Sequence, residues 1–207
     1  NPQEKPDRAA ILAAVATRPD DFVTNLRAGT LLKDEDQTKA ITYLRKCVEV
    51  FPFYTGEGNP YTLLAQIYAA RKDKPAEAAI LTDYIRIDEN DYDAAKRLAL
   101  LRADLGDKQG ELEALKLSFF ISPFDPALHM KAGDVMMDLN DPKGALVEYT
   151  VGLQLKPVNL AEAHYNLARA QFADGNRAAA RKSLLQSLEL APSYGKALEL
   201  LLKLKAN

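Results

Sequence analysis

The sequence of 207 residues predicts an all-α fold in which antiparallel helix pairs follow one another as an array. Two observations carry this prediction: the pattern of the segment AEAHYNLARAQFADGNRAAARKSLLQSLELAP at 161–192, and its recurrence along the chain. Inside the segment, Gly175 can adopt the left-handed backbone that ends a helix, and the asparagine after it can cap the next helix. Ala168 and Ala180 are small enough to let the two helices approach closely, and Leu167 is expected to be buried between them.

The pattern recurs at a period of 34 residues or nearly so, which is typical of repeat arrays. Small residues, Ala145 and Ala40, stand at the equivalent of Ala180 in two other segments. In the remaining two segments, Glu77 and Glu111 stand near the place where alanine is expected. A proline closes most of the segments. The frame predicts five helix pairs, at 21–57, 58–91, 92–125, 126–160 and 161–194.

The period, the helix-turn-helix form and the order of small and large residues resemble the tetratricopeptide repeat family, and 161–194 matches its pattern best. The resemblance implies a right-handed superhelical array, a solenoid, whose concave groove is formed by the first helix of each pair. Some positions depart from the family pattern: no segment has the consensus tryptophan, Arg27 stands at a usually apolar place, and two glutamates stand near the alanine place. The alternative is an ordinary helical bundle whose hairpins are similar by chance.

The two ends are expected to differ from the repeats between them. Residues 1–20 resemble the second half of a repeat, either as a half-repeat or as a capping helix. Because residue 1 is asparagine, we expect a processed or cut chain and favour the removal of a preceding helix. Residues 195–207 are expected to form a C-terminal capping helix, with Leu200 and Leu204 uncovered and available for self-association or for a missing domain. The leucines expected to cover the last pair are Leu198, Leu201 and Leu202.

Composition argues against several classes of function. A formal net charge of −2 creates no overall field that attracts nucleic acid or an anionic membrane. No run of 18 uncharged apolar residues encodes a membrane span, and cytoplasmic and periplasmic locations both stay open. The single cysteine, Cys47, occupies a small-residue place and is expected to be a buried thiol. His129 and His164 stand at equivalent packing places, without a metal-binding or phosphate-binding motif, so we expect no metal, no cofactor and no catalysis.

The resemblance implies that ligand contacts come from one stripe of the first helices, on the concave side. Arginine and asparagine there can bind the carboxylates and backbone of an extended peptide, while aromatic residues bury its side chains. The basic residues are expected to belong to no packed face; the alternative is that the stripe is merely solvated. The lysine–asparagine set with which some family members hold acidic C-termini of heat-shock chaperones is absent, so no co-chaperone role is inferred. The expected peptide-binding residues are Lys96, Arg97, Met130, Lys131, Tyr165, Asn166, Arg169 and Phe172.

A second candidate surface is aromatic. The segments FPFYTGEGNPY at 51–61 and SFFISPFDP at 118–126 both gather aromatic residues after the second helix of a pair. Tyr54 and Phe120 are the members that fit the repeat pattern least well. They are expected either to join an exposed patch used for partners or to pack in the core, and we favour core packing.

The predicted function is that of a non-catalytic scaffold that binds a protein or peptide segment in the groove. A first alternative is the non-catalytic C-terminal repeat region of a larger enzyme such as a bacterial zinc peptidase, because LELAPSYGKALELLLKLK at 188–205 is similar to the repeat tails of such proteins. An N-terminal domain of the same full-length chain would then be a partner. A second alternative is RNA binding by a related helical-hairpin array, which the slight acidity and the lack of a continuous Lys/Arg track disfavour.

Overall fold

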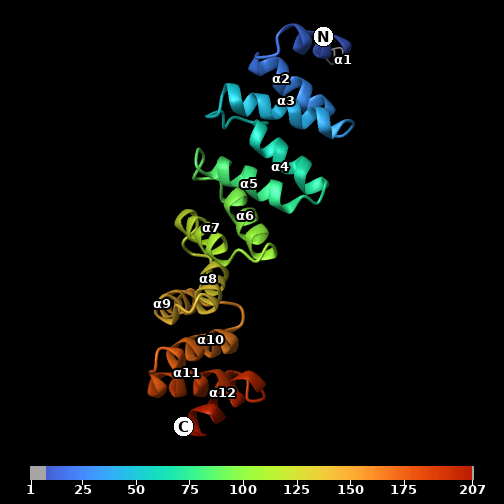
Figure 1. Cartoon of the computed structure of the whole chain (residues 1–207). Helices are drawn as coiled ribbons and strands as arrows, with labels where there is room; N and C mark the ends of the chain where they lie inside the picture. Colours follow the sequence, from blue (N-terminus) through green and yellow to red (C-terminus); the bar gives the residue numbers. More distant parts are fainter. Residues whose placement is uncertain (1–7, 207) are drawn as a thin grey trace, which may run out of the picture. The chain divides into compact units, whose positions relative to one another are not determined.

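The computed structural model describes residues 8–206, and over these residues the chain is all-helical, as predicted (Figure 1). By contacts it divides into two units, one ending at Leu101 and one beginning at Arg102. Consecutive helices form antiparallel pairs, α2 with α3 and α4 with α5 in the first unit, and α8 with α9 and α10 with α11 in the second. The helices of the described residues are α1 (Arg8–Thr17), α2 (Phe22–Leu32), α3 (Gln37–Val50), α4 (Pro60–Ala70), α5 (Lys74–Ile85), α6 (Tyr92–Asp104), α7 (Lys108–Ile121), α8 (Pro126–Asp138), α9 (Pro142–Gln154), α10 (Leu160–Ala173), α11 (Arg177–Leu190) and α12 (Gly195–Ala206).

Most helices begin at an aspartate or asparagine that caps the first turn. Asp107 accepts a hydrogen bond from the backbone N–H of Gly110 at 2.9 Å, and Asn176 accepts one from Ala179 at 3.1 Å. These bonds satisfy backbone donors that have no partner within the helix. The predicted role of Asn176 as a cap is therefore confirmed.

The turns inside the pairs recur in phase with the repeat. Gly106 and Gly175 have φ of +73° and +85°, in the left-handed region that glycine adopts without a steric cost. Lys72 and Asn140 occupy the equivalent places and have φ of +58° although they carry side chains. A left-handed backbone is less favourable by about 1–2 kcal/mol for such residues. At these four places the turn therefore has the same left-handed backbone whether or not glycine stands there.

Small residues allow the helices of a pair to approach closely. Ala40, Ala145 and Ala180, which stand at equivalent places of α3, α9 and α11, are fully buried. Between α2 and α3, a Cβ atom added to Gly29 would lie 2.6 Å from Cγ of Leu44, so only glycine fits without displacing this buried leucine. The predicted close approach of the paired helices follows from these positions.

The core of the second unit is centred on a few fully buried side chains. Tyr149 of α9 is the largest of them, and its ring fills the space that a Cβ atom on Gly133 of α8 would occupy. Ala168 and Leu184 of the last pair are also fully buried. Leu167, expected at the centre of this interface, is only half-buried, because the helix turns Ala168 rather than its neighbour toward α11.

A helix packs against the neighbouring helices at each end of the described residues, and the C-terminal one is rotated differently from the prediction. Helix α1 packs through Ile11 and Val15 against α2, whereas residues 1–7 lie outside the described residues. At the C-terminal end, Leu200 is buried and Leu204 packs partly in the same cluster. The expectation that these two leucines are uncovered is therefore wrong. Leu198 and Leu202, expected to cover the last pair, are 42% and 65% exposed.

Cys47 is expected to be unreactive in the folded protein. Its side chain is fully buried in α3, and burial raises the pKa of the thiol to about 12. The nucleophilic thiolate is therefore scarce at neutral pH, and reagents cannot reach the sulfur. A disulfide reagent at about pH 8 should leave the native chain unlabelled and label one thiol per chain in denaturant. Rapid labelling of the native chain would contradict this burial.

Candidate functional site

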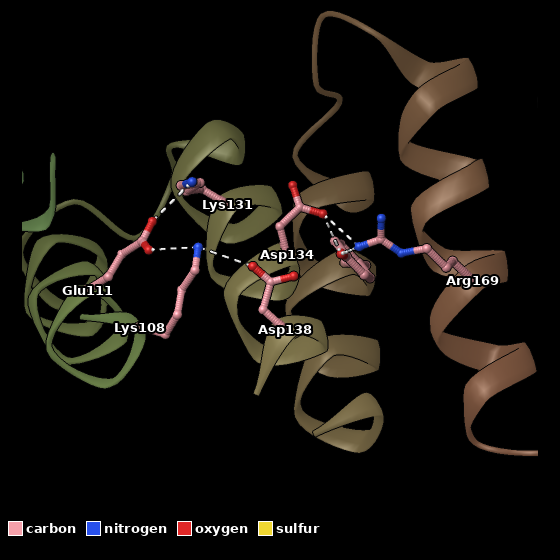
Figure 2. Close-up of polar contacts among 7 residues, drawn as sticks. Lys108, Glu111, Lys131, Asp134, Asp138 and Arg169 are labelled. Carbon is pink, nitrogen blue, oxygen red and sulfur yellow. Dashed lines mark hydrogen bonds and ion pairs between the residues drawn. The ribbon is translucent and has the colours of Figure 1, made fainter. Parts of the chain in front are cut away.

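Helices α7, α8 and α10 of the second unit carry a row of charged side chains (Figure 2). Helix α8 is the first helix of its pair and α10 the first helix of the next, and the two are in contact. Figure 2 shows the side chains pointing toward one another across the gaps between helices, rather than each into solvent. The members of this charged row are Lys108 and Glu111 of α7, Lys131, Asp134 and Asp138 of α8, and Arg169 of α10.

Glu111 is the buried end of the row. Its side chain is 1% exposed, and it occupies the place that alanine fills at 145 and 180. Nζ of Lys131 lies 3.0 Å from its Oε1 atom, and Nζ of Lys108 lies 3.4 Å from its Oε2 atom. Lys108 also lies 3.1 Å from Asp138, and this hydrogen bond is the largest cause that raises the pKa of Lys108. A buried carboxylate is thus balanced by two half-exposed lysines.

Arg169 closes the other end of the row. Its Nη2 atom donates to Oδ1 of Asp134 at 3.0 Å and to the hydroxyl of Tyr149 at 3.1 Å. The Tyr149 hydroxyl donates to the same Asp134 oxygen at 2.7 Å. Burial raises the pKa of Tyr149, and its hydroxyl therefore stays a donor at neutral pH. Three side chains from α8, α9 and α10 are joined in this way.

The apolar residues predicted for the site line the same helices but take part in packing. Tyr165 meets Tyr194 edge-to-face, with ring centroids 5.5 Å apart. Phe172 packs against the hydrophobic cluster that contains Leu200. The centroid of its ring lies 5.8 Å from the guanidinium carbon of Arg177. Met130 is half-buried, and its sulfur packs where a Cβ atom on Gly152 would stand.

Asn166 is 8% exposed. Of the residues predicted to contact a ligand on α8 and α10, it is thus the one that offers the least surface to a ligand.

Lys96 and Arg97 lie on α6 in the first unit. Arg97 binds the carboxylate of Glu77 in α5 with two hydrogen bonds, Nε to Oε1 at 2.6 Å and Nη2 to Oε2 at 2.9 Å. Glu77 is 3% exposed and stands, like Glu111, near the expected alanine place. Nζ of Lys96 lies 5.6 Å from the ring of Tyr92. Arg97 and Lys131 are exposed, as expected for residues outside the packed faces, but each also balances a buried glutamate, which was not expected.

Sequence reasoning missed these internal pairs, although a signal for them was present. Each buried glutamate is followed 20 residues later by its cation, Glu77 by Arg97 and Glu111 by Lys131. Where the place holds Ala145, the residue 20 positions on is an uncharged tyrosine. A glutamate at the alanine place, followed 20 residues later by an arginine or a lysine, therefore predicts an ion pair between the two.

The two aromatic residues that fitted the repeat pattern least well, Tyr54 and Phe120, differ in their burial. Tyr54 packs against Phe22 and Phe51, with ring centroids 5.0 and 6.1 Å away, but it is only partly buried and does not belong to the core. Phe120 is 74% exposed, and the expectation of core packing is wrong for it, because α7 turns Phe119 rather than Phe120 toward His129 of α8. Phe124 in the following turn is 81% exposed.

The two histidines have structural surroundings. Nδ1 of His129 lies 2.8 Å from Glu148, and Nε2 lies 3.0 Å from the carbonyl oxygen of Pro123. Burial lowers the pKa of His164. Within residues 8–206, no group of three or more histidine, cysteine or acidic side chains is arranged to hold a metal ion. None of the helices there combines the length and the apolar character needed to cross a bilayer.

Comparison with known proteins identifies the repeat. The model of the family described as tetratricopeptide repeat matches residues 161–194. Residues 161–194 match the tetratricopeptide repeat, and the chain shares the fold of solved tetratricopeptide-repeat (TPR) structures. The predicted resemblance and the helical solenoid class are thereby confirmed. Among the curated proteins, none matches the sequence.

Several solved structures share this fold at low sequence identity. YrrB, described as a TPR protein with an unusual peptide-binding site, has a TM-score of 0.59 and 16% identity, over 94% of this chain and 98% of YrrB. The MamA protein has a TM-score of 0.55 and 18% identity, over 80% of this chain and 91% of MamA. The first TPR of Spaghetti (RPAP3), bound to the HSP90 peptide SRMEEVD, has a TM-score of 0.51 and 18% identity, over 56% of this chain and 90% of that one.

Proposed function

We propose that the chain is a non-catalytic module that binds an extended segment of a partner protein along the exposed side of α8 and α10. The observation that carries the proposal is the combination of half-exposed apolar and charged side chains on these two first helices. Tyr165 and Phe172 offer aromatic surface, Met130 offers flexible apolar surface, and Lys131 and Arg169 offer cations whose side chains are 47% and 35% exposed.

These groups fit the needs of a peptide in an extended conformation. Aromatic side chains bury apolar residues of a ligand at little loss of conformational entropy. A guanidinium or ammonium group at the edge of such a surface can add a charge-assisted hydrogen bond to a ligand carboxylate. We also propose Lys96 and Arg97 as peptide contacts of the first unit, taken by itself.

The known proteins with this fold support the proposal. YrrB is described as having a peptide-binding site, and the Spaghetti repeat was solved with a bound peptide. At these identities the likeness concerns the fold, so the ligand of this chain has to be found by experiment. We propose a partly acidic peptide because cations flank the aromatic residues of α10.

Selection of peptides on the immobilised 207-residue chain tests this proposal. A selected peptide should bind the parent, and Phe172→Ala should weaken binding by about tenfold, since loss of one well-packed aromatic contact changes affinity on that order. Phe120→Ala, which removes an exposed phenylalanine elsewhere in the same unit, is the matched control and should leave affinity unchanged. Circular dichroism should show the same helix content for both variants. Loss of binding in Phe120→Ala with normal binding in Phe172→Ala would place the binding surface on the aromatic segment instead.

A further inference from the structure

We infer that Glu111 is an internal competitor for the cations of the peptide-binding surface, and that it lowers the affinity of this surface for acidic ligands. The inference rests on the proposed function of α8 and α10. It concerns a residue on the neighbouring helix α7, which has no exposed surface to offer a ligand itself. Figure 2 shows the two carboxylate oxygens of Glu111 joined by dashed lines to Lys131 and to Lys108.

The equivalent places of the following pairs show that packing does not require a glutamate here. Ala145 and Ala180 fill the same place in α9 and α11 and are fully buried. A glutamate at 111 is longer by several atoms, and these atoms carry its carboxylate to the first helix of the next pair, where Lys131 lies 3.0 Å away. The extra length thus serves an ionic contact between pairs.

Attraction between opposite charges, rather than an aligned hydrogen bond, joins Glu111 to Lys131. Within the described residues, no donor is aligned for a hydrogen bond to Oε1 of Glu111, although the ammonium group of Lys131 is close. Oε2 receives one bond from Lys108, which divides its charge between Glu111 and Asp138. The buried carboxylate therefore depends on Lys131 for its balance, because a buried charge without a partner is strongly unfavourable.

Because Glu111 depends on Lys131, an acidic peptide has to compete with Glu111 for this lysine. A ligand carboxylate that draws Lys131 away leaves Glu111 buried with only the shared charge of Lys108. The ligand must outcompete an internal carboxylate that is always present at the site. When a group is available only for a fraction of the time, the apparent affinity falls by that fraction. Removing the charge of Glu111 should release Lys131 for the ligand.

The test uses fluorescein-labelled decaglutamate as the probe and fluorescence anisotropy at low salt as the measurement. Glu111→Gln keeps the shape of the side chain and should bind the probe about tenfold more tightly than the parent, if Lys131 is otherwise free about a tenth of the time. Glu111→Ala, which places at 111 the residue used at 145 and 180, should give the same gain and guards against a folding defect of the glutamine variant.

The matched control is Glu113→Gln. Glu113 lies on the same helix, is exposed and bonds only to Gln109 among the contacts seen, so its variant changes the net charge equally without touching Lys131. The Glu113→Gln variant should bind the probe with nearly the affinity of the parent. The only change expected is the small gain that comes from one negative charge fewer on the chain. The inference is overturned if both Glu111 variants bind the probe like the parent, or if Glu113→Gln gains as much as they do.

A further variant separates this inference from the proposed function. Combining Glu111→Gln with Lys131→Gln should abolish the gain, because the released cation is gone, and persistence of the gain would overturn the inference. The peptide selected on the parent chain tests the proposed function independently. If that peptide binds through α10 while the Glu111 variants gain nothing, the inference alone fails; if no selected peptide depends on α8 or α10, the proposed function fails.

Discussion

Tyr149→Ala is expected to lower the free energy of unfolding by about 3–5 kcal/mol, as large aromatic truncations in packed cores do. Tyr149 is fully buried, and its ring occupies the space left open by Gly133 on the facing helix. Alanine would leave a cavity there and would also remove the hydroxyl that joins Asp134 to Arg169. Urea denaturation followed by circular dichroism measures the effect.

Tyr149→Phe separates packing from hydrogen bonding. It keeps the ring and removes only the hydroxyl, so we expect a loss of about 1.5–3 kcal/mol, the usual contribution of a hydrogen bond to a charged group. A Tyr149→Ala variant that unfolds at the same urea concentration as the parent would contradict the packing described for α8 and α9.

Arg97→Ala is expected to destabilise the first unit by about 3 kcal/mol, because it leaves Glu77 buried without its cation. Glu77→Ala should cost less than about 1 kcal/mol, since it removes the buried charge together with its need for a partner. The half-exposed guanidinium of Arg97 can then be solvated by water. Alanine is also the residue that fills the equivalent place at 40, 145 and 180. The two variants of one ion pair should therefore differ strongly, and thermal unfolding measures the difference.

Lys96→Ala is the matched control for Arg97→Ala. Lys96 is the adjacent residue of α6, is exposed, and contacts only the ring of Tyr92 among the interactions seen. Its replacement should change stability by less than about 0.5 kcal/mol, as is usual for surface positions. Equal losses in Arg97→Ala and Glu77→Ala would show that the pair is a net source of stability, contrary to this account.

Much of the fold could be predicted because the repeat imposes the same local chemistry in each pair. The place held by Gly106 and Gly175 has a left-handed backbone even where Lys72 or Asn140 stands there. The cap before a second helix and the small residue inside it recur for the same reason. A period read from the sequence therefore determines turns, caps and helix pairs together.

The rotation of individual helices was harder to predict. In α12 the packed side includes Ala197, Leu200 and Leu204, whereas the prediction placed Leu198 and Leu202 inward. Neighbouring positions of a helix differ by about 100° around its axis. A short leucine-rich helix looks apolar on every side, so its sequence does not indicate which side faces the last pair.

The sequence could predict which residues line the candidate site, but not the ion pairs that they form with neighbouring helices. The first-helix positions of Lys131 and Arg169 follow from the repeat frame. Their partners depend on which carboxylate of a neighbouring helix lies within reach, and acidic residues are abundant along the chain. Glu111, the partner of Lys131, and Glu77, the partner of Arg97, are both buried near places where the repeat pattern expects alanine. A pattern that assumes an alanine there cannot indicate an ion pair.

Hydrogen exchange with and without a peptide selected on the parent chain tests the central claim most directly. Amides of α8 and α10 should exchange more slowly when the peptide is bound, because a ligand along these helices suppresses their local opening. Amides of the segment 118–126, which carries exposed Phe120 and Phe124, should exchange as in the free chain. Slower exchange confined to 118–126 or to α9 and α11, with α8 and α10 unchanged, would contradict the claim.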